Sequence, residues 1–266
     1  MSESPWVRRG LRIATGVTLA FIYLPLLIVG IYAFNPSRTA AWPPAGFTLD
    51  WFGEALGDPT VLAAFTNSLV AGVAATLVAL VLGTMAALAV QRFAFFGRET
   101  ISLLLVLPIA LPGVVSGIAL STTFRTLDVR FGIMTIIVGH ATFCVVIVYN
   151  NVLARLRRTP RSAEEASADL GADSWQTFGR ITLPAMRTAL LSGGLLAFAL
   201  SFDEVIVTNF TAGPGTQTIP LWILASVQRP TQLPEVNVVA LVLILLSVVP
   251  VYFAQRSGGE TATIAR

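Results

Sequence analysis

Asp203 and Glu204 are two adjacent carboxylates at the end of a long apolar run that also contains Ser201. Ionised groups at or inside a bilayer are costly, so they need water, a partner or a function. One interpretation places both carboxylates in water at the external interface, where they end the run. The other is that they attract a cation to a transport pathway. Neighbouring residues on a helix point about 100° apart, so at most one carboxylate is expected to face that pathway.

The remaining residues that could do chemistry are few. The single His, His140, and the single Cys, Cys144, share one apolar run and have no acidic neighbour, so they predict neither a metal site nor an internal disulfide. A lone His in a span is a functional candidate, but we expect His140 to hydrogen-bond a neighbouring helix. All 17 basic residues are Arg, and an ATP-hydrolysing phosphate-binding loop needs a Lys. The sequence therefore predicts no catalytic residue and a chain that is not an enzyme.

The composition is typical of a membrane protein. Of the 266 residues, 55% are hydrophobic and 12% charged, against about 25% charged in an ordinary soluble domain. About 20 apolar residues cross a bilayer as a helix. We therefore predict an all-α polytopic protein with one membrane domain over residues 1–266 and a first span too long for a signal peptide. The predicted spans are 13–34, 62–90, 101–124, 131–153, 183–204 and 236–255.

Two segments are expected to be irregular. The Pro108–Gly113 stretch should break the third span, because Pro removes a backbone donor and bends a helix. The apolar run Val205–Val227 contains Gly213, Pro214 and Gly215, so we predict an external loop that holds a short helix near Ile219–Val227.

The Arg residues predict the orientation. With the N-terminus inside, 13 of the 17 Arg residues lie on the cytoplasmic side and 4 outside. Positive residues prefer the cytoplasmic side, so both termini are predicted to be cytoplasmic. This placement also explains the basic charge without nucleic-acid binding.

Residues 160–182 form the longest cytoplasmic segment. Ser162 with Glu165, and Asp173 with Gln176, have the spacing of helix-starting capping boxes. Gly171 lies between them, where a left-handed turn costs least. We therefore predict two short helices joined at Gly171. On periodicity alone, the segment could be a plain connector with its aromatic residues at the headgroups.

The full pattern of this segment resembles the signature of type I ABC importer permeases. Ser167 replaces the second Ala of the signature, and the residues that match it at the right spacing are Glu165, Ala166, Gly171, Ile181, Leu183 and Pro184. The resemblance implies that the segment couples the permease to a cytoplasmic ATPase subunit, with Glu165 as the charged contact and Gly171 permitting the turn.

The resemblance also implies partners and a location. These are a second homologous permease, two ATPase subunits that bind ATP and Mg, and an extracytoplasmic solute-binding protein. The chain would hold no cofactor of its own. It would lie, multi-pass, in the lipid of the bacterial cytoplasmic (inner) membrane and work by alternating access.

Several runs, among them Leu49–Phe52, Ser201–Pro220 and Pro234–Asn237, are similar to the second permease of spermidine/putrescine importers. This resemblance implies a polyamine substrate, which acidic groups and aromatic faces would recognise. The candidate pathway residues are Ser201, Asp203, Glu204 and Trp51. Trp51 is equally an interfacial anchor by type.

Other functions stay open. Gly113 stands where related polyamine permeases often carry an acidic residue. Sulfate, ferric iron or an amino acid is therefore an alternative substrate. An ATPase-independent channel or scaffold is the alternative from another class.

Overall fold

The computed structural model describes residues 5–39 and 41–263, and within these ranges it contains helices and no strand. Residues 1–4, 40 and 264–266, including Arg266 of the charge count, lie outside the described residues. The chain forms two compact units, Met1–Leu62 with Ile223–Arg266, and Ala63–Trp222. The single domain over residues 1–266 stays a prediction.

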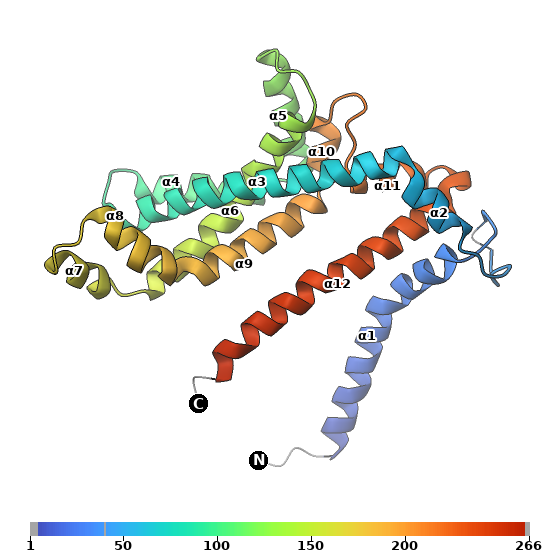
Figure 1. The fold of residues 1–266 in the computed structure, drawn as a ribbon, viewed down its shortest axis with the longest axis horizontal. Helices are drawn as coiled ribbons and strands as arrows, with labels where there is room; N and C mark the ends of the chain where they lie inside the picture. Colours follow the sequence, from blue (N-terminus) through green and yellow to red (C-terminus); the bar gives the residue numbers. More distant parts are fainter. Residues whose placement is uncertain (1–4, 40, 264–266) are drawn as a thin grey trace. The chain divides into compact units, whose positions relative to one another are not determined.

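The helices of Figure 1 are α1 (Pro5–Ala33), α2 (Asp50–Gly57), α3 (Pro59–Arg92), α4 (Arg98–Ala110), α5 (Gly113–Thr126), α6 (Ile133–Arg158), α7 (Ser162–Asp169), α8 (Ser174–Thr177), the π-helical turn η1 (Phe178–Thr182), α9 (Leu183–Phe202), α10 (Ile206–Thr211), α11 (Ile219–Val227), the 3-10 turn η2 (Pro230–Gln232) and α12 (Leu233–Thr263). Five helical segments are long and apolar enough to cross a membrane, and the bent pair α4 and α5 makes a sixth if counted as one span. The all-α polytopic fold is confirmed.

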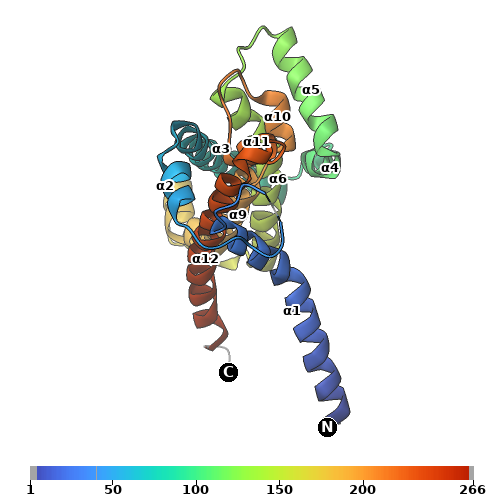
Figure 2. The ribbon, with the colours of Figure 1, turned by 90° about the vertical axis from the view of Figure 1, so that its right-hand side faces the viewer.

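The predicted break in the third span is confirmed. α4 ends at Ala110, α5 begins at Gly113, and the two helices differ in direction by 104° (Figure 2). Leu111 between them is extended, with φ −79° and ψ 141°. A residue before Pro is pushed out of the helical region by the Pro ring, and Pro112 follows Leu111. The third span is therefore two short helices and not one rod.

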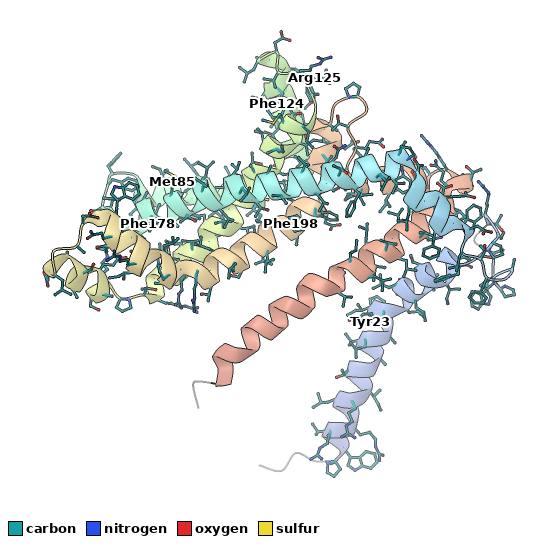
Figure 3. All side chains as sticks on the ribbon, viewed as in Figure 1. Tyr23, Met85, Phe124, Arg125, Phe178 and Phe198 are labelled. Atoms are coloured by element: carbon teal, nitrogen blue, oxygen red, sulfur yellow. The ribbon has the colours of Figure 1, made fainter. Side chains whose placement is uncertain are left out.

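In the unit that contains both ends of the chain, α12 packs against α1 and α2. Asn35, which is fully buried, accepts backbone N–H groups of Ser37 and Ala45 on its side-chain oxygen and so organises the loop after α1. Most of α1 is exposed and apolar on every side, as Tyr23 illustrates (Figure 3). An all-round apolar helix needs lipid or another helix around it.

In the other unit, α6 is the central helix. It packs along α9, and its buried side chains, including Tyr149 and Phe143, form most of the core. α3 approaches α6 through small residues, because a Cβ on Gly83 would lie 2.8 Å from the carbonyl oxygen of Val145. Small residues at such contacts let helix backbones come close inside a membrane.

The segment after α9 is more ordered than expected. α9 ends at Phe202, two residues before the predicted end of the span at 204. The helix at Ile219–Val227 is confirmed as α11. The helix α10, which begins at Ile206, four residues after the end of α9, was not predicted.

Candidate functional site

The two carboxylates after α9 have different environments. The Glu204 carboxylate accepts a hydrogen bond of 2.8 Å from the backbone N–H of Val207 in the first turn of α10. The first N–H groups of a helix have no partner inside the helix, so this bond stabilises the start of α10. Asp203 is exposed, and its carboxylate has no hydrogen bond or ion pair within the described part of the chain. Of the pair, Asp203 is the carboxylate free to meet a ligand.

Ser201 takes part in a buried hydrogen-bonded network. Its hydroxyl lies 2.7 Å from Nδ1 of His140, and Nε2 of His140 lies 2.8 Å from Oγ1 of Thr208. Thr208 donates its only hydroxyl proton to the carbonyl of Glu204. We therefore assign the proton of the ring to Nε2, which donates to Thr208, while Nδ1 accepts from Ser201. The expected bond from His140 to a neighbouring helix is confirmed, and it links α6 to both α9 and α10.

Trp51 is placed by contacts within its own unit. It is buried, and its indole N–H donates to the carbonyl of Asn35 at 2.9 Å. The guanidinium of Arg38 lies over its ring, 4.9 Å from the centroid. A cation–π site on this ring is thus occupied by the protein's own Arg. A substrate role for Trp51 stays a prediction and requires that Arg38 be displaced.

The coupling segment has the predicted two helices, α7 and α8, joined at Gly171. Gly171 has φ +81°, its N–H donates to the carbonyl of Ala168, and the N–H of Ala172 donates to that of Ser167. This is the Schellman arrangement that ends a helix with a left-handed Gly. The expected turn is confirmed, and a Cβ at Gly171 would be strained by the positive φ.

The two predicted helix starts have different outcomes. The Asp173 carboxylate accepts the N–H of Gln176 at 2.8 Å, and the Gln176 side chain accepts the N–H of Asp173, so this capping box is confirmed. The prediction of a capping box between Ser162 and Glu165 is wrong. The residue before α7 is Arg161 in a helical conformation, so the helix starts without a side-chain cap and Glu165 is left exposed.

Ser167 has a specific contact. It is buried, and its hydroxyl lies 3.0 Å from that of Thr177 on α8. An Ala at this position could not make that bond. Ala166 is exposed and Ile181 is half-buried. Leu183 and Pro184 are the first two residues of α9, and both are exposed.

The outer surface of the segment carries two large apolar side chains. Leu170, the last residue before the Gly171 turn, is 89% exposed, and Trp175 on α8 is 84% exposed. Glu165 is exposed as well. Neither Leu170 nor Trp175 was among the predicted site residues, and their exposure is a finding of the structure.

Residues 79–257 match the family described as binding-protein-dependent transport system inner membrane component. The chain belongs to this family.

Several relatives and a solved structure resemble this permease. It is 37% identical over 246 residues to the putrescine transport system permease protein PotI of Escherichia coli K12, covering 90% of this chain and 85% of PotI. It is 33% identical over 237 residues to the spermidine/putrescine transport system permease protein PotC of the same strain, covering 89% of each chain. A bacterial ABC transporter involved in the import of the acidic polysaccharide alginate shares the fold, with a TM-score of 0.73 at 16% identity over 97% of this chain and 99% of that chain.

Family membership places the permease in the bacterial inner membrane as a multi-pass transport subunit, which is not itself an enzyme. Permease subunits of such importers work with a second permease and with a periplasmic binding protein.

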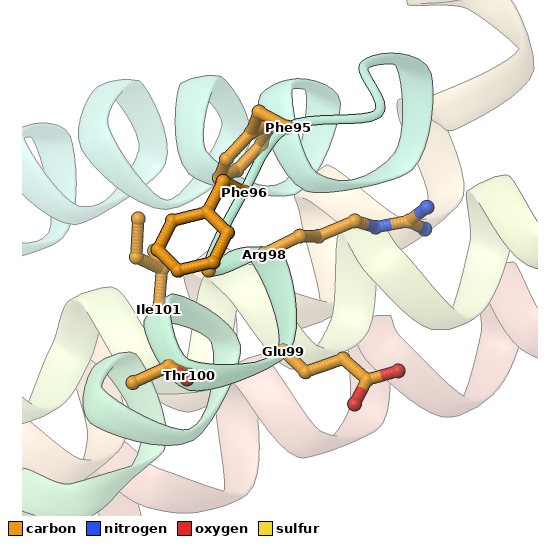
Figure 4. A pocket seen from close by; sticks show the side chains of 7 residues that line it. Phe95, Phe96, Arg98, Glu99, Thr100 and Ile101 are labelled. Atoms are coloured by element: carbon orange, nitrogen blue, oxygen red, sulfur yellow. The ribbon is translucent and has the colours of Figure 1, made fainter.

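A hollow on the described surface of the permease does not involve these site residues. Its volume is about 670 Å³, and it is lined by Phe95–Ile101, which form the end of the connection between α3 and α4 and the first turn of α4. The rings of Phe95 and Phe96 lie on one side, and the side chains of Arg98 and Glu99 extend to the other (Figure 4). Because consecutive residues of one short stretch form its whole lining, it is open space around the start of α4 and not a binding cavity.

We predict that Thr208→Val destabilises the permease by about 1–3 kcal/mol, because the buried Nε2–H of His140 would lose its acceptor. Thr123→Val is the matched control. The Thr123 hydroxyl also bonds the carbonyl four residues earlier, but it is exposed and touches no His. Thermal unfolding in detergent measures the stability of both purified variants. Equal midpoints for the two variants would contradict the role assigned to His140.

Proposed function

We propose that this permease imports polyamines such as spermidine and putrescine, by alternating access driven by two separate ATPase subunits. The observation in the structure that carries the substrate class is the exposed, unpaired carboxylate of Asp203 at the corner between α9 and α10. A polyamine is a chain of ammonium groups, and a free carboxylate complements that charge. The relatives PotI and PotC, which are named for putrescine and for spermidine/putrescine, support the same class.

Asp203 directly follows an aromatic residue that belongs to a cluster of three rings. The ring of Phe202, the residue before Asp203, contacts Phe198 at 5.7 Å and Phe65 at 6.4 Å between centroids. All three rings are half-buried, so each keeps an accessible part. Cations bind the faces of aromatic rings, which would supplement the charge of Asp203.

The coupling segment supports the use of an external energy source. With both termini on the cytoplasmic side, Glu165, Leu170 and Trp175 would face the cytoplasm. Exposed apolar side chains beside a charge are typical of protein interfaces, where buried aromatic residues supply much of the binding energy. ATP and Mg would be bound by the ATPase partner.

The substrate proposal predicts that Asp203→Asn lowers uptake of labelled spermidine and putrescine at least tenfold, about 1.4 kcal/mol of lost stabilisation. The matched control, Asp128→Asn, makes the same chemical change at an exposed turn residue whose φ of 51° Asn tolerates. Glu204→Gln should act mainly on stability, since its carboxylate holds the start of α10.

Uptake of sulfate, ferric iron and amino acids by the same cells separates the alternatives. Polyamine uptake that is absent, or unchanged in Asp203→Asn, would contradict the proposed substrate. If no ATPase subunit co-purifies with the permease, the channel or scaffold alternative gains support and the importer proposal fails.

A further inference from the structure

Three polar side chains, two of them in the coupling segment, form a closed triangle. Nη2 of Arg92 donates to Oε1 of Glu164 and, at 2.9 Å, to Oγ1 of Thr182. The Thr182 hydroxyl donates in turn to Oε1 of Glu164 at 2.6 Å. Thr182 is 2% exposed, and the side chains of Arg92 and Glu164 are 30% and 25% exposed. Each group thus has two partners, and the charges of the guanidinium and the carboxylate balance.

The triangle joins three separate elements of one unit. Arg92 is the last residue of α3, Glu164 lies in α7, and Thr182 is the last residue of η1, directly before α9. A second hydrogen bond also links the start of α7 to the end of α3, since Arg161, the residue before α7, donates to the carbonyl of Gln91 at 2.7 Å. Figure 1 shows α7 and α8 at the end of the unit where α3 ends and α9 begins.

Apolar packing contributes little to holding α7. Its only buried residue is Ser167, a polar one. A cavity of about 20 Å³ lies behind the helix, lined in part by Glu164, Ile181 and Thr182. The hydrophobic effect does little to fix the position of a helix that buries no apolar face. The polar contacts to α3, α8 and η1 must therefore set where α7 lies.

The element that contributes Thr182 to the triangle is irregular. η1 is a π-helical turn, and such turns in longer helices are often found at functional sites. Thr182 connects this turn to Glu164 on α7 and to Arg92 on α3. A displacement of α7 therefore acts on the start of α9 and on the end of α3 together.

We propose that Arg92, Glu164 and Thr182 form a coupling latch, a set of positioning residues that makes α7, the end of α3 and the start of α9 move as one body. When an ATPase subunit moves the coupling segment, the latch passes the displacement to two membrane-spanning helices. This inference rests on the proposed function, in which the segment binds an ATPase. It assigns the adjacent carboxylates different tasks, with Glu165 facing the partner and Glu164 facing inward.

The test uses the complete importer, with the second permease, the ATPase subunits and the binding protein, reconstituted in lipid vesicles. Glu164→Gln and Thr182→Val are expected to keep ATP hydrolysis and co-purification within twofold of wild type. They should lower the labelled polyamine transported per ATP hydrolysed at least tenfold. A role in folding alone would change the amount of complex, but not this ratio.

Two further variants sharpen the result. Thr182→Ser keeps the hydroxyl and should restore the ratio lost in Thr182→Val, and Asp169→Asn is the matched control because it neutralises an exposed α7 carboxylate outside the latch. A ratio less than threefold below wild type in both Glu164→Gln and Thr182→Val would overturn the latch. Loss of the ATPase subunits from these two variants would overturn it too, because it would place the residues in the interface. Failure of the wild-type permease to bind an ATPase would instead overturn the proposed function, and the latch with it.

Discussion

Replacing Glu165 with Arg is expected to reduce ATP-driven uptake by the permease about a hundredfold. The side chain is exposed on α7, and it lies in the segment that carries the exposed Leu170 and Trp175. If Glu165 faces a basic group of an ATPase subunit, a positive charge there replaces attraction with repulsion. Like charges across an interface cost several kcal/mol, and about 2.8 kcal/mol corresponds to a hundredfold.

Co-purification of the ATPase subunits and uptake of labelled polyamine are the two measurements. Both should fall in Glu165→Arg, whereas Glu99→Arg, the same change on an exposed residue of α4, should leave both near wild type. Trp175→Ala is expected to weaken co-purification by truncating the largest apolar side chain of the segment. Full retention of the ATPase subunits by Glu165→Arg would contradict the assigned interface.

Replacing Gly83 with Leu is expected to prevent the permease from accumulating in folded form. Even a Cβ at this position would lie 2.8 Å from the carbonyl oxygen of Val145 and 2.9 Å from Cβ of Val148. Gly83→Ala should already destabilise by about 1–3 kcal/mol, because the contact is with the backbone of α6 and α3 would have to move outward. This result would reverse the helix propensity, which favours Ala over Gly by about 1 kcal/mol.

Gly16 on α1 is the matched control, since a Cβ added there meets no atom within 4 Å. Gly16→Ala should be neutral or slightly stabilising. The fraction of monodisperse protein on size exclusion and the thermal midpoint in detergent report both pairs of variants. A Gly83→Ala midpoint equal to that of Gly16→Ala would show that α3 and α6 do not pack as closely as the structure places them.

Local rules were enough to predict the features that depend on near neighbours. Three such features are the break before Pro112, the left-handed turn at Gly171 and the Asp173 cap. In each, the interacting residues lie within about four positions, so a short stretch of sequence contains both partners of the interaction. The capping box of Ser162 with Glu165 is the exception. Its spacing was right, but α7 begins after a helical Arg161, which leaves no extended residue to act as the cap.

The candidate site was only partly predictable. Sequence reasoning identified Asp203 and Glu204 but gave no means of distinguishing them. The distinction depends on α10, a six-residue helix without a strong pattern, whose Val207 N–H takes up Glu204. Ser201 was a pathway candidate by its position, but His140, 61 residues away in the chain, binds its hydroxyl.

By itself, the sequence determined that this protein is a helical membrane permease, because apolar length and the coupling signature are properties of contiguous segments. Only the tertiary structure decided which polar groups are available. Asp203 is free because α10 uses its neighbour, Trp51 is covered by Arg38, and Glu164 is drawn inward by Arg92 while Glu165 stays outside. The deciding partner of Trp51 and of Glu164 lies on another element, whereas Glu204 is held by Val207, three residues along the chain, once α10 has formed. Buried and half-buried polar groups bind the partners that folding brings close to them, and these partners depend on how the helices form and pack as well as on the spacing along the chain.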